Sequence, residues 1–169
     1  MRTELCQFCL KSGILCSKCR EKVRKGEISE TDLRIARLLL SLEEKYPPLQ
    51  NVYFHKAVEA DGILAILVER GDVARMLSYG GKITKILGQM TGKKIRILEY
   101  NSDERKFLED LFAPLSIIAI NKIWLPDNTT ETRVILKKKG KRRPRINIRA
   151  TKGIAKKIQG MTLRVEFSD

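Results

Sequence analysis

The sequence predicts an α+β protein in which two small modules follow a short cysteine-bearing segment. Helical and strand-like apolar patterns occur in the order α-β-β-α-α-β over residues 29–101. A similar order recurs over residues 102–169, with a basic stretch in place of one helix. All four cysteines fall within the first 19 residues, which sets residues 1–28 apart. A chain of 169 residues has room for two or three such modules in tandem.

The first segment is defined by the pattern Cys6-x2-Cys9-x6-Cys16-x2-Cys19. A Cys-x2-Cys pair can place two thiolates on one metal ion, and two pairs complete a tetrahedral all-sulfur site. The six-residue gap, with residues 11–13 as its turn, predicts a compact two-knuckle hairpin that holds a structural Zn²⁺. An iron–sulfur cluster, a redox or disulfide role and four free thiols remain alternatives.

The first module opens with a helix after a polar linker at residues 20–27. Ser29 is the expected N-cap, with Asp32 at the third helical position, and the helix is predicted over residues 30–45. Pro47 and Pro48 end it. Two strands, at residues 51–58 and 63–69, then form a hairpin across the turn at 59–62. His55, in the first strand, is expected to be an ordinary strand or surface histidine rather than a metal ligand.

A glycine pair interrupts the helical pattern that follows, in the stretch MLSYGGKIT at residues 76–84. Each glycine inside a helix costs about 1 kcal/mol relative to alanine, so the pair predicts a turn between a short helix ending near Leu77 and a second helix over residues 82–90. The free N–H groups at the start of the second helix would form an anion site. A strand over residues 94–100 completes the module.

The second module begins with a helix from residue 102 or 103 to Phe112. Strands are predicted over residues 116–125 and 130–138, and Pro126-Asp127-Asn128 forms the turn between them. A helix over 150–159 and a strand over 161–167 follow the basic stretch. Trp124, at a strand end, is expected to pack in the core rather than stack on a base.

Charge is the main compositional indication of function. The net charge is +14, and its density is greatest in the second module. Thirteen Lys or Arg residues fall between Arg133 and Arg164, where the sequence has no acidic residue. Such a one-sided segment favours contact with nucleic acid, with an acidic protein, a membrane surface or a solubility tail as alternatives.

Other functional classes find little support in the sequence. No apolar run approaches the roughly 18 residues of a membrane span, and the N-terminus lacks an apolar signal core, so we expect a soluble cytoplasmic protein. The chain has one His and no evident pairing of a nucleophile with a base. We therefore expect a protein that is not an enzyme.

Two stretches carry a resemblance to a known family. GDVARMLSYGGKITKILGQMTGKKIRILEY, at residues 71–100, resembles the type II K-homology (KH) domain, with its short helix, Gly-x-x-Gly loop, longer helix and closing strand. LEDLFAPLSIIAINKIWLP, from Leu108, is similar to the start of a second KH unit in the NusA-like tandem-KH proteins of archaea. The resemblance implies two tandem type II KH-like domains, 29–101 and 102–169, the second degenerate.

The resemblance also implies RNA binding, in which the loop lies against the backbone of unpaired nucleotides. The loop falls on Ser78, Tyr79, Gly80 and Gly81, with Ser78 in place of the first glycine. If that position requires a positive φ, Ser78 is strained; otherwise its hydroxyl could bond a phosphate oxygen. A purely structural turn between helices is the alternative. The flanking contacts would come from Arg75, Lys82 and Lys85, with Tyr79 available for stacking on a base.

The second unit has no glycine loop, and a basic arm stands in its place. Side-chain charge could replace the backbone contacts there. The arm residues are Lys137, Lys138, Lys139, Lys141, Arg142, Arg143, Arg145 and Arg149. The resemblance favours a NusA-like transcription elongation or termination factor that binds nascent RNA and RNA polymerase; a small-subunit ribosomal or ribosome-associated protein that binds rRNA is the alternative.

Overall fold

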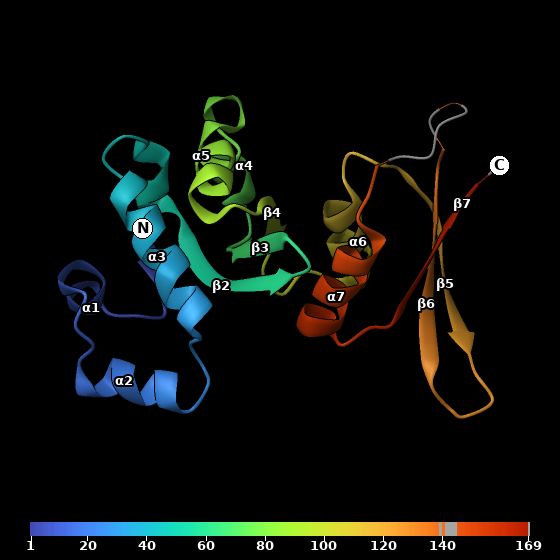
Figure 1. Ribbon diagram of the computed structural model, residues 1–169, viewed down its shortest axis with the longest axis horizontal. Helices are drawn as coiled ribbons and strands as arrows, with labels where there is room; N and C mark the ends of the chain where they lie inside the picture. The colour runs from blue at the N-terminus through green and yellow to red at the C-terminus, as the bar shows by residue number, and fades with distance from the viewer. Residues whose placement is uncertain (139, 141–144, 169) are drawn as a thin grey trace. The chain divides into compact units, whose positions relative to one another are not determined.

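A computed structural model describes residues 1–138, 140 and 145–168, and divides the chain into two compact units, Met1–Asn101 and Ser102–Asp169. Each unit contains one small sheet and its own helices (Figure 1). The predicted α+β class is therefore confirmed. None of the described helices is long and apolar enough to span a membrane.

Unit 1 is built on a four-stranded sheet in the order β1-β2-β3-β4. The β2–β3 hairpin is antiparallel, whereas β1 pairs with β2 and β4 pairs with β3 in parallel. The strands are β1 (Arg2–Thr3), β2 (Tyr53–Ala60), β3 (Ile63–Val68) and β4 (Lys94–Glu99). The helices are α1 (Gln7–Ser12), α2 (Ser17–Arg24), α3 (Glu30–Leu42), α4 (Val73–Met76) and α5 (Lys82–Thr91), with 3₁₀ turns η1 (Pro47–Asn51) and η2 (Tyr79–Gly81).

The core of unit 1 joins the helices to the sheet. Ile35 and Leu39 of α3 are fully buried, as are Leu64 of β3 and Leu87 of α5. The same apolar cluster continues through Cys9 and its neighbours in α1 and α2. The cysteine-bearing segment therefore shares one continuous core with the first sheet.

The start of α3 matches the predicted capping box and adds a tie to the sheet. Ser29 Oγ accepts a hydrogen bond from Asp32 N (3.0 Å), and Asp32 Oδ2 accepts one from Ser29 N (2.9 Å). Asp32 Oδ1 also accepts a hydrogen bond from Ala57 N in β2 (2.7 Å). One buried carboxylate thus fixes the helix start against the hairpin.

Residues 1–28 differ from the predicted hairpin and linker. They contain two short helices, and the predicted linker lies largely within α2. Lys, Arg and Glu are good helix formers, and Cys16 Sγ accepts a hydrogen bond from Cys19 N as an N-cap would. Gly13 (φ 75°) ends α1 in the left-handed conformation. A cysteine can therefore act as a helix cap as well as a ligand, which the spacing alone does not reveal. Helix α3 also ends at Leu42, three residues before the predicted end.

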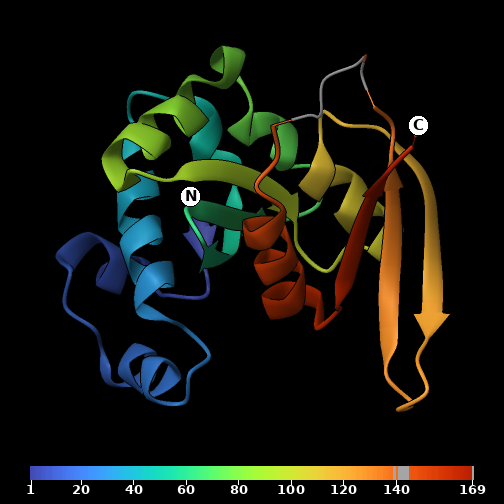
Figure 2. The ribbon, with the colours of Figure 1, turned by 45° about the vertical axis from the view of Figure 1, so that its right-hand side comes forward.

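Unit 2 has a three-stranded sheet in the order β5-β6-β7, antiparallel between β5 and β6 and parallel between β6 and β7. Helices α6 and α7 lie on the same side of this sheet (Figure 2). Val134 and Leu136 are fully buried, while Arg133, on the opposite face, pairs with Glu166 (Nη2–Oε2 2.7 Å). The elements are α6 (Glu104–Phe112), β5 (Ile117–Trp124), β6 (Thr130–Leu136), α7 (Ile148–Gln159) and β7 (Leu163–Phe167). Their order agrees with the prediction.

Candidate metal centre and nucleic-acid interface

The four cysteines form a compact sulfur cluster. Their Sγ atoms all lie within 4.8 Å of one another, with Cys6 and Cys9 3.2 Å apart and Cys6 and Cys19 3.8 Å apart. All four are free of disulfide bonds. A tetrahedral Zn²⁺ with Zn–S bonds of about 2.3 Å requires Sγ atoms about 3.8 Å apart. The cluster therefore fits a four-sulfur metal site.

The thiols of the cluster differ in pKa because their positions relative to the helix ends and their burial differ. Cys6 and Cys16 occupy the N-cap positions of α1 and α2. The hydrogen bond from Cys19 N, aided by the neighbouring thiols, lowers the pKa of Cys16 to about 6. Cys9 accepts a hydrogen bond from Cys16 N (3.1 Å), which lowers its pKa, but burial and adjacent thiols outweigh it and raise the pKa to about 12. A bound cation would favour the thiolate form of all four.

The glycine pair forms a sharp turn between α4 and α5. Tyr79, Gly80 and Gly81 have positive φ angles of 57°, 64° and 79° in succession. Ser78 has φ −63° and ψ 170°, an extended conformation that any residue can adopt. Of the two open possibilities for Ser78, the unstrained conformation is the one observed. Gly80 is exposed, and apart from its two chain neighbours no atom of the described residues lies within 4 Å of a Cβ built on it.

Several side chains around this turn contact other residues of unit 1. Ser78 Oγ donates a hydrogen bond to Arg75 O (2.5 Å), and Arg75 forms an ion pair with the buried Asp72. The Tyr79 ring packs edge-on against Tyr46, with centroids 5.3 Å apart, and remains 49% exposed. Arg75 and Tyr79 are thus oriented by contacts within unit 1.

Lys82 and Lys85 lie in the first two turns of α5, directly after the glycine turn. Both side chains are exposed, and neither forms an ion pair with any residue that the structure describes. Gly81 O is occupied by Thr84 Oγ1, which donates to it over 2.8 Å. The turn therefore combines open backbone, a helix N-terminus and two exposed cations.

The basic arm is described only in part. Lys137, Lys138, Gly140, Arg145 and Arg149 belong to the described residues, whereas Lys139, Lys141, Arg142 and Arg143 lie outside them. Lys137 and Arg145 are exposed, and Lys137 N donates to Ser116 O (2.9 Å) at the end of the β5–β6 pair. Asn147 then caps α7 by accepting a hydrogen bond from Ala150 N (3.0 Å). The described arm residues thus connect the end of β6 to the start of α7, with Arg149 in its first turn.

Two aromatic predictions have different outcomes. Trp124 was predicted to pack in the core, and that is wrong, because the residue is 75% exposed at the end of β5, beyond the buried part of the sheet. His55 lies in β2 outside the sulfur cluster, as predicted, but its side chain is only 13% exposed and stacks on Tyr100. Sequence reasoning did not anticipate that partner.

Comparison with known proteins gives partial matches. No protein-family model matches the chain. Over 80 residues it is 34% identical to the probable transcription termination protein NusA of Methanocaldococcus jannaschii, covering 47% of this chain and 42% of the relative. Over 65 residues it is 31% identical to the probable transcription termination protein NusA of Methanococcus vannielii, covering 38% and 36%. The chain thus spans less than half the length of these curated relatives.

A solved structure shares the fold more broadly. The crystal structure of the protein designated APE1850 superimposes with a TM-score of 0.51, covering 78% of this chain and 96% of that one. Its sequence identity is 21%, so the similarity concerns the fold alone. The two sequence matches alone support a NusA-like family resemblance for part of the chain.

Proposed function

We propose that this chain is an RNA-binding factor without enzymatic activity, composed of two type II KH-like units, the second degenerate, and acting in transcription as its NusA relatives are named to do. The observation that carries the proposal is the turn at Tyr79–Gly81. Three successive positive φ angles bring exposed backbone to the start of α5, where Lys82 and Lys85 extend without ion-pair partners among the described residues. A phosphate of unpaired RNA would meet the positive end of the helix and two ammonium groups at this place. The N–H groups of Gly81 and Lys82 already donate to Ser78 O and Tyr79 O within the turn.

The other features have supporting roles in this proposal. The four cysteines would hold a structural Zn²⁺ that stabilises α1 and α2 against α3, with all four ligand positions filled by protein sulfur. The basic arm and Arg149 would bind phosphates through side-chain charge, in place of a glycine turn. Arg75, which forms an ion pair with Asp72, would contact the bound RNA on the α4 side of the turn.

A matched pair of substitutions tests the loop. Gly81→Asp places a negative charge where the phosphate would lie, whereas Gly81→Asn has nearly the same shape without the charge. Asn and Asp both tolerate a positive φ, and a Cβ at this position meets Thr84 Oγ1 at an ordinary 3.6 Å. We expect Gly81→Asp to weaken binding to an unpaired RNA oligomer at least tenfold more than Gly81→Asn, as measured by fluorescence anisotropy. Equal affinities of the two variants would contradict phosphate binding at this turn.

Partner assignment needs an experiment in the cell. We expect crosslinked RNA to consist mainly of nascent transcripts, and the chain to co-purify with RNA polymerase. Salt-resistant co-sedimentation with small ribosomal subunits, without polymerase, would instead support the rRNA-binding alternative.

A further inference from the structure

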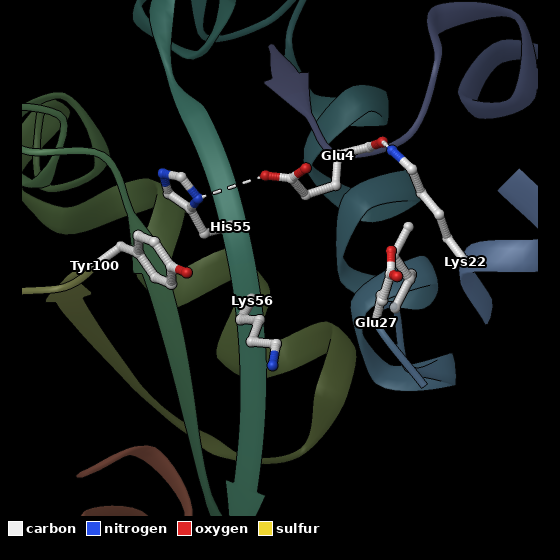
Figure 3. A pocket seen from close by; sticks show the side chains of 7 residues that line it. Glu4, Lys22, Glu27, His55, Lys56 and Tyr100 are labelled. Carbon is white, nitrogen blue, oxygen red and sulfur yellow. Dashed lines mark hydrogen bonds and ion pairs between the residues drawn. The ribbon is translucent and has the colours of Figure 1, made fainter. Parts of the chain in front are cut away.

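A cavity of about 350 Å³ lies in unit 1 between the cysteine-bearing segment and the sheet (Figure 3). It contains none of the residues of the glycine turn. Its volume is at the lower end of the range of small-ligand pockets, about 300–1,000 Å³, so it suits a ligand of the size of one nucleotide. The lining residues that matter here are Glu4, Lys22, Glu27, His55, Lys56 and Tyr100.

One wall of the cavity is an ordered aromatic stack. The centroid of the His55 ring lies 3.9 Å from the centroid of the Tyr100 ring, at an interplanar angle of 10°, and 4.5 Å from the centroid of the Tyr53 ring. Its Nε2 lies 2.7 Å from Glu69 Oε2 and its Nδ1 3.8 Å from Glu4 Oε1. Tyr100, at the end of the stack, is 42% exposed. The stack is thus held in place by the protein and still presents free aromatic surface.

A β-bulge adds a cation to the same cavity. In a regular strand, adjacent residues such as His55 and Lys56 would point to opposite faces. The register of β2 against β3 shifts between Phe54 and Lys56, and both His55 and Lys56 line the cavity. The register shift therefore allows Lys56 and its neighbour His55 to line the same cavity.

Two charged groups in the cavity have no partner among the described residues. Lys22 Nζ donates to Glu4 O (2.8 Å), and Glu4 accepts a hydrogen bond from Tyr53 Oη (3.1 Å). The side chains of Glu27 and Lys56, by contrast, form no hydrogen bond or ion pair with any of the residues described. Figure 3 shows Lys56 on β2 and Glu27 on the segment after α2, on the two sides of the cavity. A ligand that carries both a donor edge and an anionic group would satisfy both.

We propose that this cavity binds one unpaired guanine ribonucleotide. Guanine presents adjacent N1–H and N2–H donors to a carboxylate, which can only accept hydrogen bonds. Adenine and cytosine place an acceptor nitrogen beside their amino donor, and uracil flanks its single N–H with two carbonyl groups. Glu27 therefore selects guanine, Tyr100 provides the stacking surface, and Lys56 binds the phosphate.

This proposal adds a base preference to the proposed RNA binding. It rests on that function only in assuming that the nucleotide belongs to an RNA chain. Free guanosine monophosphate and a guanosine within an RNA chain offer the same base, stacking face and phosphate. The test therefore includes both.

His55 provides a built-in reporter, because it is the only histidine in the chain. The ring proton signals of His55 in the full chain are followed by NMR during titration with each of the four ribonucleoside 5′-monophosphates. We expect guanosine monophosphate to shift these signals with an affinity about tenfold higher than uridine monophosphate. A parallel titration compares a uridine hexamer that carries one central guanosine with an all-uridine hexamer.

Matched variants assign the response to the cavity. Glu27→Gln should abolish the preference for guanine, whereas Glu44→Gln, an equal charge change at another exposed glutamate, should retain it. Tyr100→Leu should weaken binding of all nucleotides. Urea unfolding of each variant checks that it retains the fold.

The outcomes separate this site from the glycine turn. A response to the monophosphate supports a site for free nucleotide, and a response to the guanosine hexamer alone supports a site within bound RNA. The Gly81→Asp variant should retain the response to the monophosphate even if it loses affinity for RNA. Absence of a guanine-dependent shift in both titrations, or an equal response to all four bases, would overturn the proposal.

Discussion

Asp32 is the residue on which the start of α3 depends. Its buried carboxylate accepts hydrogen bonds from the backbone N–H groups of Ser29 and Ala57, so it serves the helix and the sheet together. Asp32→Ala would leave both N–H groups without this acceptor. We expect the free energy of unfolding to fall by about 2–4 kcal/mol in urea titrations.

Glu30 provides the control for that substitution. It is exposed in the first turn of the same helix, where its contribution is limited to the helix dipole. Glu30→Ala should cost no more than about 0.5 kcal/mol. Equal losses of stability in the two variants would show that the hydrogen bonds from Ser29 N and Ala57 N contribute nothing measurable.

The backbone conformations of Ser78 and Gly80 predict that RNA binding tolerates substitution of Ser78 and is weakened by substitution of Gly80. Ser78 has a negative φ, so glycine is not required there, whereas Gly80 has φ 64°. Ser78→Gly should leave RNA affinity unchanged and cost about 1 kcal/mol of stability, because it adds backbone entropy to the unfolded chain and removes the hydrogen bond to Arg75 O.

Gly80→Val provides the contrast, because a β-branched residue is strained at positive φ. It should weaken RNA binding by distorting the turn, while circular dichroism confirms that the helices persist. A larger loss of affinity for Ser78→Gly than for Gly80→Val, by fluorescence anisotropy, would disprove this assignment.

At the scale of elements, we expect α1 and α2 to depend on metal binding by the sulfur cluster. They have 6 and 8 residues, short enough that isolated helices of their length are not stable in water. We therefore expect a strong chelator, or Cys16→Ser, to reduce helical circular dichroism and lower the unfolding temperature of unit 1. Bound metal would be measured by elemental analysis of the same samples.

Ser17→Ala is the matched control for the metal experiment. Ser17 is exposed next to Cys16, and no hydrogen bond of its side chain with the described residues is observed. This variant should retain one metal ion and full helicity. Loss of metal from Cys16→Ser without any loss of helicity would refute a structural role for the ion.

The helices and strands show which parts of the fold can be predicted from sequence patterns. The strands and longer helices follow from local periodicity and from capping signals such as Ser29, which act within one segment. The sulfur cluster was also evident, because its ligands are close in sequence. Helices α1 and α2 were missed because capping by Cys16 is not a usual helix signal. Trp124 was misplaced because alternation along a strand does not reveal where the covering helices end.

The cavity beside β2 could not be found in this way. Glu4, Glu27, His55 and Tyr100 come from four separate segments, and only the packing of residues 1–28 on the sheet brings them together. The bulge that reorients Lys56 is likewise a property of the β2–β3 register. A lone histidine in a strand gave no indication of an ordered ring stack.

At the scale of the whole molecule, the charge distribution predicts how RNA binding responds to salt. The net charge is +14, and each single-strand phosphate neutralised contributes about −0.7 to the slope of log affinity against log salt. Serine substitution of Lys137, Lys138, Arg142, Arg143 and Arg145 should make the slope less negative by about 0.7 for each phosphate that the arm no longer neutralises, with similar weakening for all RNA sequences.

A second variant with the same net charge distinguishes direct phosphate contacts by the basic arm from the electrostatic field of the whole protein. Serine substitution of five exposed basic residues of unit 1, namely Lys11, Lys18, Lys25, Arg70 and Lys94, also lowers the net charge from +14 to +9. Because salt screens charges that lie farther apart than about 10 Å at 0.1 M, these residues should influence the slope much less than direct phosphate contacts do. Anisotropy titrations of both variants from about 50 to about 300 mM salt measure the difference. Equal slopes would mean that the arm contributes only to the overall field and makes no phosphate contact of its own.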